Sequence, residues 1–381
     1  MTATTEHRPS ASQKSISEQG LRAFTNNIFR AIGCPDADAA LATDVLVTAD
    51  LRGIDSHGVA RLSGYVRLWE NGRLNTAPEP RVVHETPTTA TVDGDGGLGL
   101  VVAPFAMEIA IEKAKQYGSG WVAIRNSNHF GIAGYHAMKA VAQDMIGYAV
   151  TNASPLVAPT FSTERLLGTN PICYAFPAGE YPPVVVDMAT SAAANGKLEV
   201  AGRAGKPIPE GWALSREGDT TTDAAAVKNG GALLPLGSDR AHGSHKGFGL
   251  SATVDILSGV LSGANYGPWV PPFVAYLQPV ADQPGQGIGH FVGAMRVDGF
   301  RPVAEFKANM DQWIARFKDA KRVDERQPVI IPGEPEYEAT RTHRIQGIPL
   351  VEAVWADLRQ LAEKLGVPPL AVEDERIAGN G

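Results

Sequence analysis

A histidine and an arginine four positions apart are the first residues of this sequence with a spacing suited to chemistry. Residues 55–58 read Asp-Ser-His-Gly, and Arg61 and Tyr65 follow them. If a helix begins near His57, then His57, Arg61 and Tyr65 share one helical face. The planar guanidinium of Arg61 would bind a carboxylate through two hydrogen bonds, while His57 would give or take a proton on a neighbouring oxygen. The same pair could instead form a helix cap and a salt bridge, so the rest of the chain must decide between these interpretations.

A second polar cluster directly follows an apolar run at residues 121–125. Residues 126–131 read NSNHFG and precede a helical pattern that contains His136. Active-site side chains are common in such loops, so Asn128 and His129 are candidates for a site. A structural role for this loop is equally open. Zinc binding is the weaker alternative, because His129 and His136 are seven positions apart and no cysteine lies near them.

Three further segments contain polar residues, and the last two of them could contact an anionic ligand. Residues 168–171 read GTNP, which is typical of a turn. In residues 187–191 a carboxylate ends an apolar run and two hydroxyls precede a predicted helix, and residues 245–247 combine a second predicted helix start with a lysine. Unpaired backbone N–H groups at helix starts attract phosphate. Ordinary N-capping would explain either segment as well.

Gly94, Gly96 and Gly99 spell G-x-G-x-x-G between a predicted strand and a predicted helix, as a dinucleotide-binding Rossmann unit requires. However, the next predicted strand ends at Arg125 and Asn126, without an acidic residue for a ribose hydroxyl. We therefore interpret these glycines as a tight turn before a helix.

The composition indicates a globular enzyme. The chain has 381 residues, 44% of them hydrophobic, which suits two or three domains, and its formal charge of −7 with no basic run argues against nucleic acid as a partner. Residues 1–16 are polar and lack the apolar core of a targeting peptide, so we expect a disordered tail and a cytoplasmic protein. The longest apolar stretch, residues 247–264, contains Asp255, and we expect no membrane span. Cys34 and Cys173 are expected to be reduced and packed.

The periodicity of apolar residues predicts a mixed α/β chain. We expect helices at residues 17–32, 36–51, 101–117, 190–200, 247–261, 303–318 and 351–365. We expect strands at residues 88–93, 121–125, 147–151, 172–176 and 183–187. Asp36 is the expected N-cap of the second helix.

Taken in order, these segments resemble the malate/L-lactate dehydrogenase family of the non-Rossmann type. That family also includes ureidoglycolate dehydrogenase, 2,3-diketo-L-gulonate reductase, sulfolactate dehydrogenase and piperideine-2-carboxylate reductase. The resemblance extends from about residue 21 to residue 365. It is carried by residues 55–61 (DSHGVAR), 126–135 (NSNHFGIAGY), 168–171 (GTNP), 185–191 (VVDMATS), 245–250 (HKGFGL) and 332–334 (PGE).

The resemblance implies a mixed α/β fold with a non-Rossmann cofactor domain, whose sheet is largely antiparallel. It implies that residues 121–299 form the NAD(P)-binding domain. Residues 17–120 and 300–381 would form a discontinuous helical and mixed domain carrying the His-Arg face. Residues 265–293 match the family weakly, which leaves the substrate less certain than the reaction.

The resemblance also implies roles for individual residues. The implied catalytic residues are His57, Ser56, Asp187 and His129, with His57 preferred over His129 as the acid or base. The implied substrate-binding residues are Arg61, Tyr65, Asn128 and Thr169. The implied cofactor contacts, for either NAD or NADP, are Asp187, Met188, Ala189, Thr190, Ser191, His245, Lys246, Gly333 and Glu334. No metal is expected.

We therefore expect a homodimeric oxidoreductase that transfers a hydride between nicotinamide and a small 2-oxo or 2-hydroxy acid, with malate or L-lactate ranked first. A cyclic imino acid, sulfolactate and ureidoglycolate are the alternative substrates. Hydrolysis by Ser56 with His57 is a rival reaction. Two features argue against it: neighbouring side chains diverge, and no G-x-S-x-G motif surrounds Ser56. A binding protein without catalytic activity is a third class, and the intact set of Ser56, His57, Arg61 and Asp187 argues against it.

Overall fold

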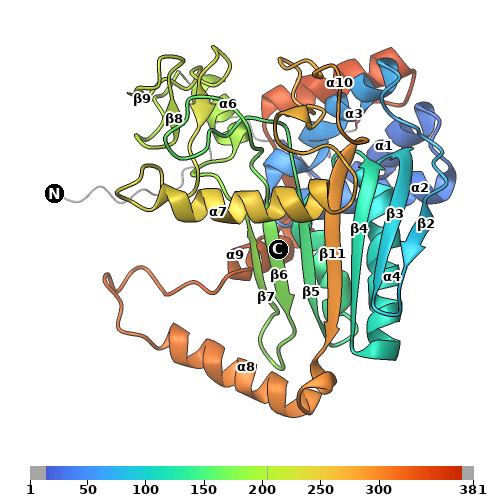
Figure 1. Cartoon of the computed structure of the whole chain (residues 1–381), viewed down its shortest axis with the longest axis vertical. Coiled ribbons are helices and arrows are strands. Elements are labelled where there is room, and N and C mark those ends of the chain that lie inside the picture. Colours follow the sequence, from blue (N-terminus) through green and yellow to red (C-terminus); the bar gives the residue numbers. More distant parts are fainter. Residues whose placement is uncertain (1–13, 204, 371–381) are drawn as a thin grey trace, which may run out of the picture. The chain divides into compact units, whose positions relative to one another are not determined.

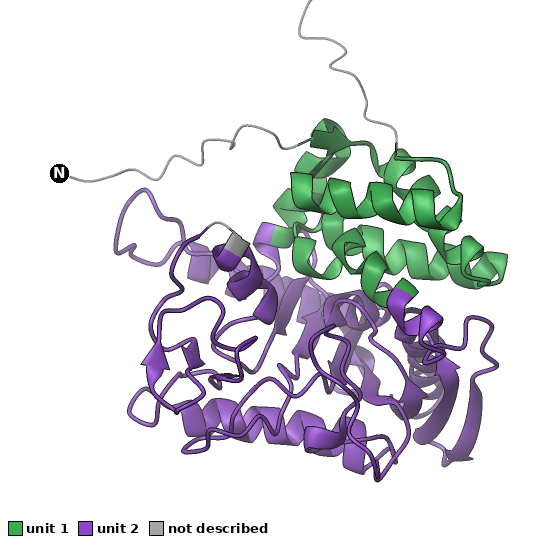
Figure 2. Cartoon of the chain, turned by 90° about the horizontal axis from the view of Figure 1, so that it is seen from above, with its two compact units in different colours: residues 1–66, 336–381 green, residues 67–335 purple. Residues whose placement is uncertain are grey.

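The computed structural model describes residues 14–203 and 205–370. These residues divide into two compact units: unit 1 lies within residues 1–66 and 336–381, and unit 2 within residues 67–335 (Figure 2). We expected domain boundaries near residues 120 and 300. As compact units, residues 67–120 instead belong with the sheet, because strand β3 (Thr89–Gly97) pairs with strand β4 (Ser119–Ser127). The assignment of cofactor binding to residues 121–299 stays a prediction.

Unit 1 is mainly helical, and the two helices expected at its start are confirmed. Helix α1 spans Glu18–Ala31 and helix α2 spans Asp36–Leu51. The Ser17 hydroxyl caps α1 by accepting a hydrogen bond from the backbone N–H of Gly20 at 3.2 Å. The expected N-cap of α2 is wrong by one residue. Pro35 precedes the helix without a side-chain cap, and Asp36 pairs with Arg30 at 2.7 Å.

The remaining elements of unit 1 come from both ends of the described chain. Helix α3 (Leu62–Glu70) begins in this unit. The unit also contains most of helix α9 (Glu334–Gln346) and all of helix α10 (Glu352–Leu365). Strand β1 (Lys14–Ile16) pairs antiparallel with strand β12 (Ile348–Leu350). Most of the expected disordered tail lies outside the described residues, but its last three residues form β1.

Unit 2 is built on a sheet of seven strands in the order β2-β3-β4-β11-β5-β6-β7 (Figure 1). Besides β3 and β4 these are β2 (Arg81–Glu85), β5 (Met145–Thr151), β6 (Ile172–Phe176), β7 (Val184–Met188) and β11 (Ile288–Arg296). Only β3 and β4 run parallel, and the other five pairings are antiparallel. This confirms the expected mixed α/β fold with a largely antiparallel sheet.

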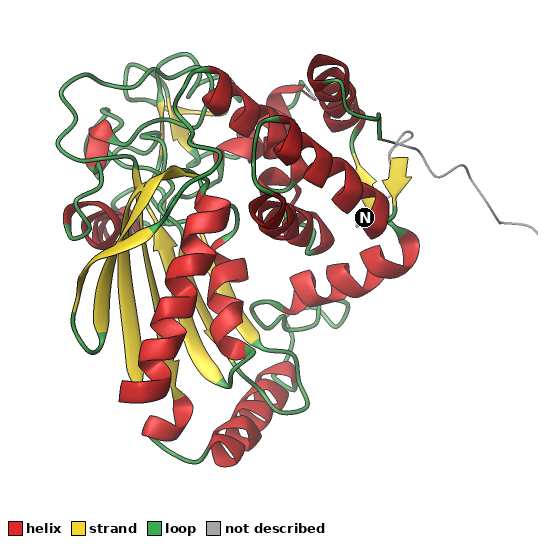
Figure 3. Ribbon diagram, turned by 90° about the vertical axis from the view of Figure 1, so that its right-hand side faces the viewer, coloured by secondary structure: helices red, strands yellow, loops and turns green. Residues whose placement is uncertain are grey.

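The two faces of the sheet are covered differently (Figures 1 and 3). Helices α4 (Gly99–Tyr117) and α5 (Ala133–Val141) pack on one face, over a core that includes Val122 and Val292. Helix α7 (Ser244–Asp255) crosses the other face beside aromatic side chains that include Trp121 and Phe291. Neighbouring residues such as Trp121 and Val122 therefore serve opposite faces, as the alternation of side chains in a strand requires.

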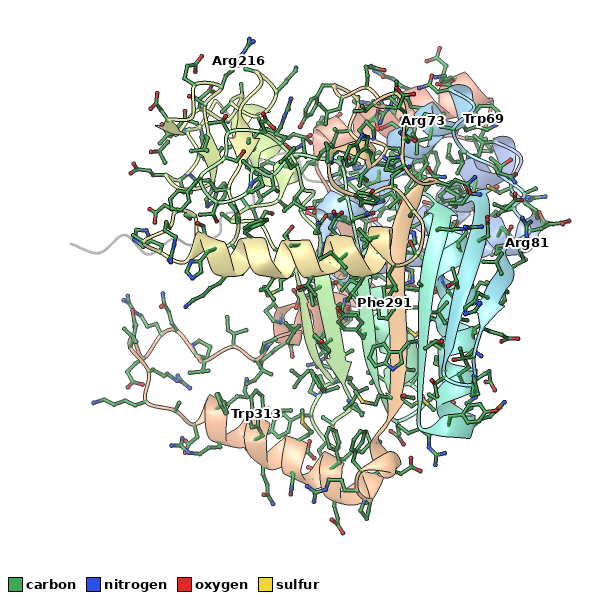
Figure 4. The ribbon with its side chains drawn as sticks, in the orientation of Figure 1. Trp69, Arg73, Arg81, Arg216, Phe291 and Trp313 are labelled. Carbon is green, nitrogen blue, oxygen red and sulfur yellow. The ribbon has the colours of Figure 1, made fainter. Side chains whose placement is uncertain are left out.

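The aromatic face extends beyond α7. The rings of Trp121 and Phe291 stack with centroids 5.8 Å apart, and Tyr174 is 40% exposed. Phe291 lies on this face below α7, and Trp313 lies on helix α8 (Val303–Lys318) (Figure 4).

The chain between β7 and β11 forms a small lobe. Strands β8 (Ala213–Leu214), β9 (Thr220–Thr221) and β10 (Ala232–Leu233) make an antiparallel sheet beside helix α6 (Asn195–Arg203). Helix α7 continues as a π-helical turn, η3 (Ile256–Val260). Short 3-10 turns η4 (Gly267–Trp269) and η5 (Val297–Gly299) flank β11 in sequence. Among the described helices, none is long and apolar enough to cross a membrane.

Candidate active site

The His57 segment is a pair of tight turns and not the start of an α-helix. Residues Asp55–His57 form one 3-10 turn (η1), Val59–Arg61 form a second (η2), and α3 begins only at Leu62. The expected helical face of His57, Arg61 and Tyr65 is therefore wrong in its geometry. The guanidinium of Arg61 instead reaches back and donates from Nε to the backbone oxygen of Ser56 at 2.5 Å. This bond ties Arg61 to the turn that carries His57.

Ser56 and His57 are joined directly by their side chains. The Ser56 hydroxyl oxygen lies 2.9 Å from Nδ1 of His57. Our argument that neighbouring side chains diverge is therefore wrong here, because a 3-10 turn brings these two together. The Ser56 hydroxyl thus engages Nδ1 and helps to hold the His57 ring in place.

A buried carboxyl group supports this double turn. Asp50, near the end of α2, accepts a hydrogen bond from the backbone N–H of Val59 at 2.8 Å. Gly58 packs so closely on it that an added Cβ would lie 2.0 Å from Oδ1 of Asp50. Burial raises the pKa of Asp50 well above its usual range. The same helix end is held by His343, whose Nδ1 lies 3.0 Å from the backbone oxygens of Asp50 and Leu51.

The electrostatics of the turn favour an uncharged His57. Burial, and then the positive charge of Arg61, lower the pKa of His57 to about 3. Together they place the pKa of His57 well below the ordinary histidine value of about 6.5. Tyr65 is fully buried, 6.2 Å from the ring of Phe29, and burial raises its pKa.

The second cluster lies where β4 ends. Asn128 is buried, and its side-chain amide donates to the backbone oxygens of Gly96 and Gly97 at 2.8 and 3.1 Å. His129 is partly exposed and stacks on Phe273, with ring centroids 4.5 Å apart. The ring of His136 instead points inward, with Nε2 2.8 Å from the backbone oxygen of Phe130. Within the described residues no group of three or more His, Cys, Asp and Glu side chains is arranged to hold a metal ion.

These contacts also explain the G-x-G-x-x-G sequence. An added Cβ on Gly99 would lie 2.1 Å from the backbone oxygen of Asn128, and one on Gly94 would lie 2.9 Å from that of Asn126. The protein's own backbone therefore occupies the start of α4, where a Rossmann protein would place a pyrophosphate. The expected tight turn is found at Gly96, whose φ is +68°, whereas Gly94 and Gly99 are required by close backbone packing.

Sequence reasoning missed a buried histidine behind this cluster. His290 on β11 lies between two hydroxyls: Nδ1 is 2.7 Å from Thr151 Oγ1, and Nε2 is 2.9 Å from Ser127 Oγ. The Thr151 hydroxyl donates to backbone oxygens at 2.9 and 3.0 Å, so it must accept from Nδ1–H of His290. Nε2 then accepts from Ser127, the residue before Asn128. The ends of three strands are thus fixed by one neutral ring, and only sheet pairing between residues far apart in sequence could have shown it.

The segment of residues 187–191 differs from its prediction. Helix α6 begins at Asn195, so Thr190 and Ser191 do not open a helix and offer no anion site of that kind. The Thr190 hydroxyl donates to the backbone oxygens of Thr169 and Asn170 at 3.1 and 3.0 Å. Oδ2 of Asp187 accepts a 2.7 Å bond from the backbone N–H of Gly134, the second residue of α5. Met188 is 37% exposed and Ala189 is half-buried.

Residues 235–237 connect this segment to the start of α7. Ser191 forms a β-bridge with Pro235, and the backbone N–H of Leu236 donates to Thr190 at 2.9 Å. Leu236 in turn packs on α7, because an added Cβ on Gly247 would lie 2.2 Å from its backbone oxygen. His245 and Lys246 are exposed in the first turn of α7, which confirms a helix start at this place.

The last predicted cofactor segment reaches the same strand. The backbone N–H of Val185 on β7 donates to Pro332 at 3.0 Å. Gly333 has a φ of +91° and lies against Val185, where a side chain would clash. Glu334 forms an ion pair with Lys318 and accepts from the backbone N–H of Ile331 at 3.1 Å. Unit 2 therefore brings residues 187–191, 245–246 and 333–334 together around β7 and residues 235–237.

Comparison with known proteins agrees with the motif order. A family model described as malate/L-lactate dehydrogenase matches residues 16–359. A malate dehydrogenase of Pyrococcus horikoshii is 44% identical over 356 residues, which are 93% of this chain and 96% of that protein. An L-sulfolactate dehydrogenase of Methanocaldococcus jannaschii is 37% identical over 348 residues, 91% of this chain and 95% of that protein.

Solved structures give the same result. A malate dehydrogenase from Pyrococcus horikoshii aligns with a TM-score of 0.86 and 40% identity, covering 96% of this chain and 99% of that one. A malate dehydrogenase from Entamoeba histolytica aligns with a TM-score of 0.86 and 34% identity, covering 94% and 99%. The chain belongs to the malate/L-lactate dehydrogenase family.

Proposed function

We propose that this dehydrogenase oxidises malate reversibly to its 2-oxo acid. As a family member it is a dehydrogenase that acts on a 2-hydroxy acid with a nicotinamide cofactor. The observation that carries malate as the substrate is the 44% identity to a malate dehydrogenase over nearly the whole chain. L-lactate, sulfolactate, ureidoglycolate and a cyclic imino acid remain the alternative substrates, and the sulfolactate dehydrogenase relative supports one of them.

In the proposed oxidation, neutral His57 acts as the base. Its Nε2 takes the proton of the substrate hydroxyl, while the Ser56 hydroxyl at 2.9 Å holds Nδ1 and fixes the ring. Arg61 binds the substrate carboxylate, and Tyr65, Asn128 and Thr169 contribute to substrate positioning. Asp187 stays a proposed catalytic residue, and His129 is the rival acid or base. The low pKa keeps His57 unprotonated when the hydroxy acid binds, which a base requires.

The proposed cofactor contacts are residues 187–191, His245, Lys246, Gly333 and Glu334. The fit to a nicotinamide dinucleotide rests on the exposed cation of Lys246 in the first turn of α7 and on glycine positions where backbone comes close to backbone. A bound nicotinamide would supply the acceptor for the hydride that leaves C2 of the substrate. The chain itself contributes binding, orientation and the movement of the proton.

We also propose a cytoplasmic homodimer with no nucleic-acid or membrane partner, by analogy with the family. The partly exposed aromatic face of the sheet and the exposed side chains of Ile256, Val260 and Leu261 offer apolar surface for a second copy. Light scattering at micromolar concentration tests this, and a monomer mass would contradict it.

The substrate proposal is tested by following the absorbance of the reduced nicotinamide with a panel of hydroxy acids. The panel contains malate, L-lactate, sulfolactate and ureidoglycolate, with an ester as the control for hydrolysis. Malate is expected to give the largest kcat/KM. A larger value for another acid would replace malate within the same reaction class. Ester cleavage without any change in nicotinamide absorbance would contradict the oxidoreductase itself.

A further inference from the structure

The turn that leads into α7 carries a cluster of basic side chains, of which the proposed function uses only His245 and Lys246. Arg240, His242, His245 and Lys246 are all exposed there, in a chain whose formal net charge is −7. The turn contains one acidic residue, Asp239. Its carboxylate is already engaged by the backbone N–H of His242 at 2.8 Å and by the ring of His242 at 2.8 to 2.9 Å.

Arg240 and His245 act as one unit. The guanidinium donates from Nη1 to Nδ1 of His245 at 3.0 Å, which requires a neutral ring acting as acceptor. Partial loss of hydration, Arg240 and Lys246 all lower the pKa of His245. The Arg240 guanidinium is therefore held by the neutral imidazole of His245, and the ammonium of Lys246 follows one residue later.

A second observation lies across from this turn. The Thr160 hydroxyl is 3.0 Å from the hydroxyl of Ser244, the first residue of α7. The next residue, Phe161, has a φ of +70° and is 88% exposed. A bulky residue with positive φ is a strained outlier, and such strain tends to occur at ligand sites. An exposed aromatic ring on this loop provides the flat surface on which a nucleobase stacks.

A stacking ring and a guanidinium close to one helix start match the adenosine end of a phosphorylated dinucleotide. NADP differs from NAD by one phosphate on the adenosine ribose, which carries close to two negative charges near neutral pH, as phosphomonoesters do. Arginine binds such a group through two parallel hydrogen bonds, whereas sites for NAD place a carboxylate at the ribose hydroxyl. Asp239 is held by its own turn, so the structure offers the guanidinium and not the carboxylate.

We propose that this dehydrogenase prefers NADP(H) to NAD(H), that Arg240 with Lys246 holds the 2′-phosphate, and that the ring of Phe161 stacks on the adenine. This proposal rests on the proposed dinucleotide site and names its cofactor. It adds Arg240 and Phe161 to the cofactor contacts that the family resemblance implies.

The test measures binding of NADPH and NADH to the full-length protein by calorimetry, so that it does not depend on turnover. The native protein is expected to bind NADPH at least about tenfold more tightly than NADH, the ratio that one charge-assisted hydrogen bond supplies. Arg240→Ala is expected to weaken NADPH binding by about tenfold and to leave NADH binding within about twofold. Arg216→Ala, a change at an arginine in the small lobe (Figure 4), is the matched control and is expected to alter neither.

Phe161→Ala tests the stacking of Phe161 on adenine separately, because adenine is common to both cofactors. It is expected to weaken NADPH and NADH equally, and to weaken 2′-AMP and 5′-AMP as well. Tighter binding of NADH than of NADPH by the native protein would overturn the preference. An equal loss of affinity for both cofactors in Arg240→Ala would also overturn it, and would assign the cluster to the pyrophosphate that both cofactors share. No change in Phe161→Ala would refute the stacking role. If neither dinucleotide binds the native protein, the proposed function fails along with this inference.

Discussion

Replacing Gly58 with alanine would put a methyl group into the space of the Asp50 carboxylate. The added Cβ would lie 2.0 Å from Oδ1 and 2.2 Å from Oδ2, and real Cβ atoms do not approach heavy atoms closer than 3.0 Å. The carboxyl group must therefore move by about 1 Å, since both it and Gly58 are buried in a close-packed interior. Such a movement breaks the 2.8 Å hydrogen bond from the Val59 N–H.

The cost follows from these two effects. A buried N–H group without a partner costs about 1 to 3 kcal/mol, and overpacking costs about 1 to 3 kcal/mol more. The free energy of unfolding is therefore expected to fall by about 2 to 6 kcal/mol. Because Val59 lies between His57 and Arg61, kcat is also expected to fall, by up to about a hundredfold for a displacement of about 1 Å.

Urea unfolding followed by circular dichroism, together with steady-state kinetics on malate, measures both losses. Gly299→Ala is the control, because a Cβ there meets no atom within 4 Å, and it is expected to stay within about 0.5 kcal/mol of the native protein. Asp50→Ala removes the obstacle, so the double variant is expected to be less damaged than the sum of the two single changes, by about 1 kcal/mol or more. Strict additivity, or a Gly58→Ala protein with native stability and kinetics, would refute this account of the turn.

The other predictions concern the site residues directly. His57→Gln is expected to lower kcat by about 10² to 10⁴ with little change in cofactor binding, and His129→Gln is expected to do less; the opposite order would exchange their roles. Arg61→Lys is expected chiefly to raise KM, because an ammonium cannot form the two-pronged bond to a carboxylate, and a pure kcat effect would count against the clamp. Lys246→Ala is expected to weaken dinucleotide binding more than Gly96→Ala in calorimetry, provided that both variants melt normally. When kcat/KM for malate oxidation is measured against pH, the inflection on the acid side is expected well below the ordinary histidine pKa of about 6.5, toward the pKa of about 3 for His57. An inflection near the ordinary value would contradict the low pKa.

The order of the motifs could be read from the sequence because each motif is local. Residues 55–61 form two short turns, residues 126–131 follow the end of β4, and residues 245–250 lie at a helix start, and neighbouring residues largely determine such local elements. The mixed α/β class was likewise accessible from periodicity. The largely antiparallel order of the sheet came only from the family resemblance, because strands β4 and β11 are far apart in sequence and yet pair along their length.

The failed predictions share a physical cause. Residues 190–194 suit a helix by composition, but Thr190 is bound to Thr169, and Ser191 pairs with Pro235, so the helix begins only at Asn195. The supporting roles of Asp50 and His290 could not be predicted from the sequence for the same reason. A buried aspartate in a helix and a histidine in a strand acquire their meaning only from the backbone groups that pack against them.

The properties of His57 depend on Arg61 in a way that links binding to chemistry. In the structure, burial and the guanidinium keep the ring neutral, as the oxidative direction requires. Reduction of the 2-oxo acid instead requires a protonated ring. If Arg61 binds the substrate carboxylate as proposed, the carboxylate would offset the positive charge of Arg61, which is the second of the two causes that lower the pKa of His57 after burial. In the proposed mechanism Arg61 therefore acts on both the substrate and His57, and Arg61→Lys should partly preserve this electrostatic effect while losing the geometry of the clamp.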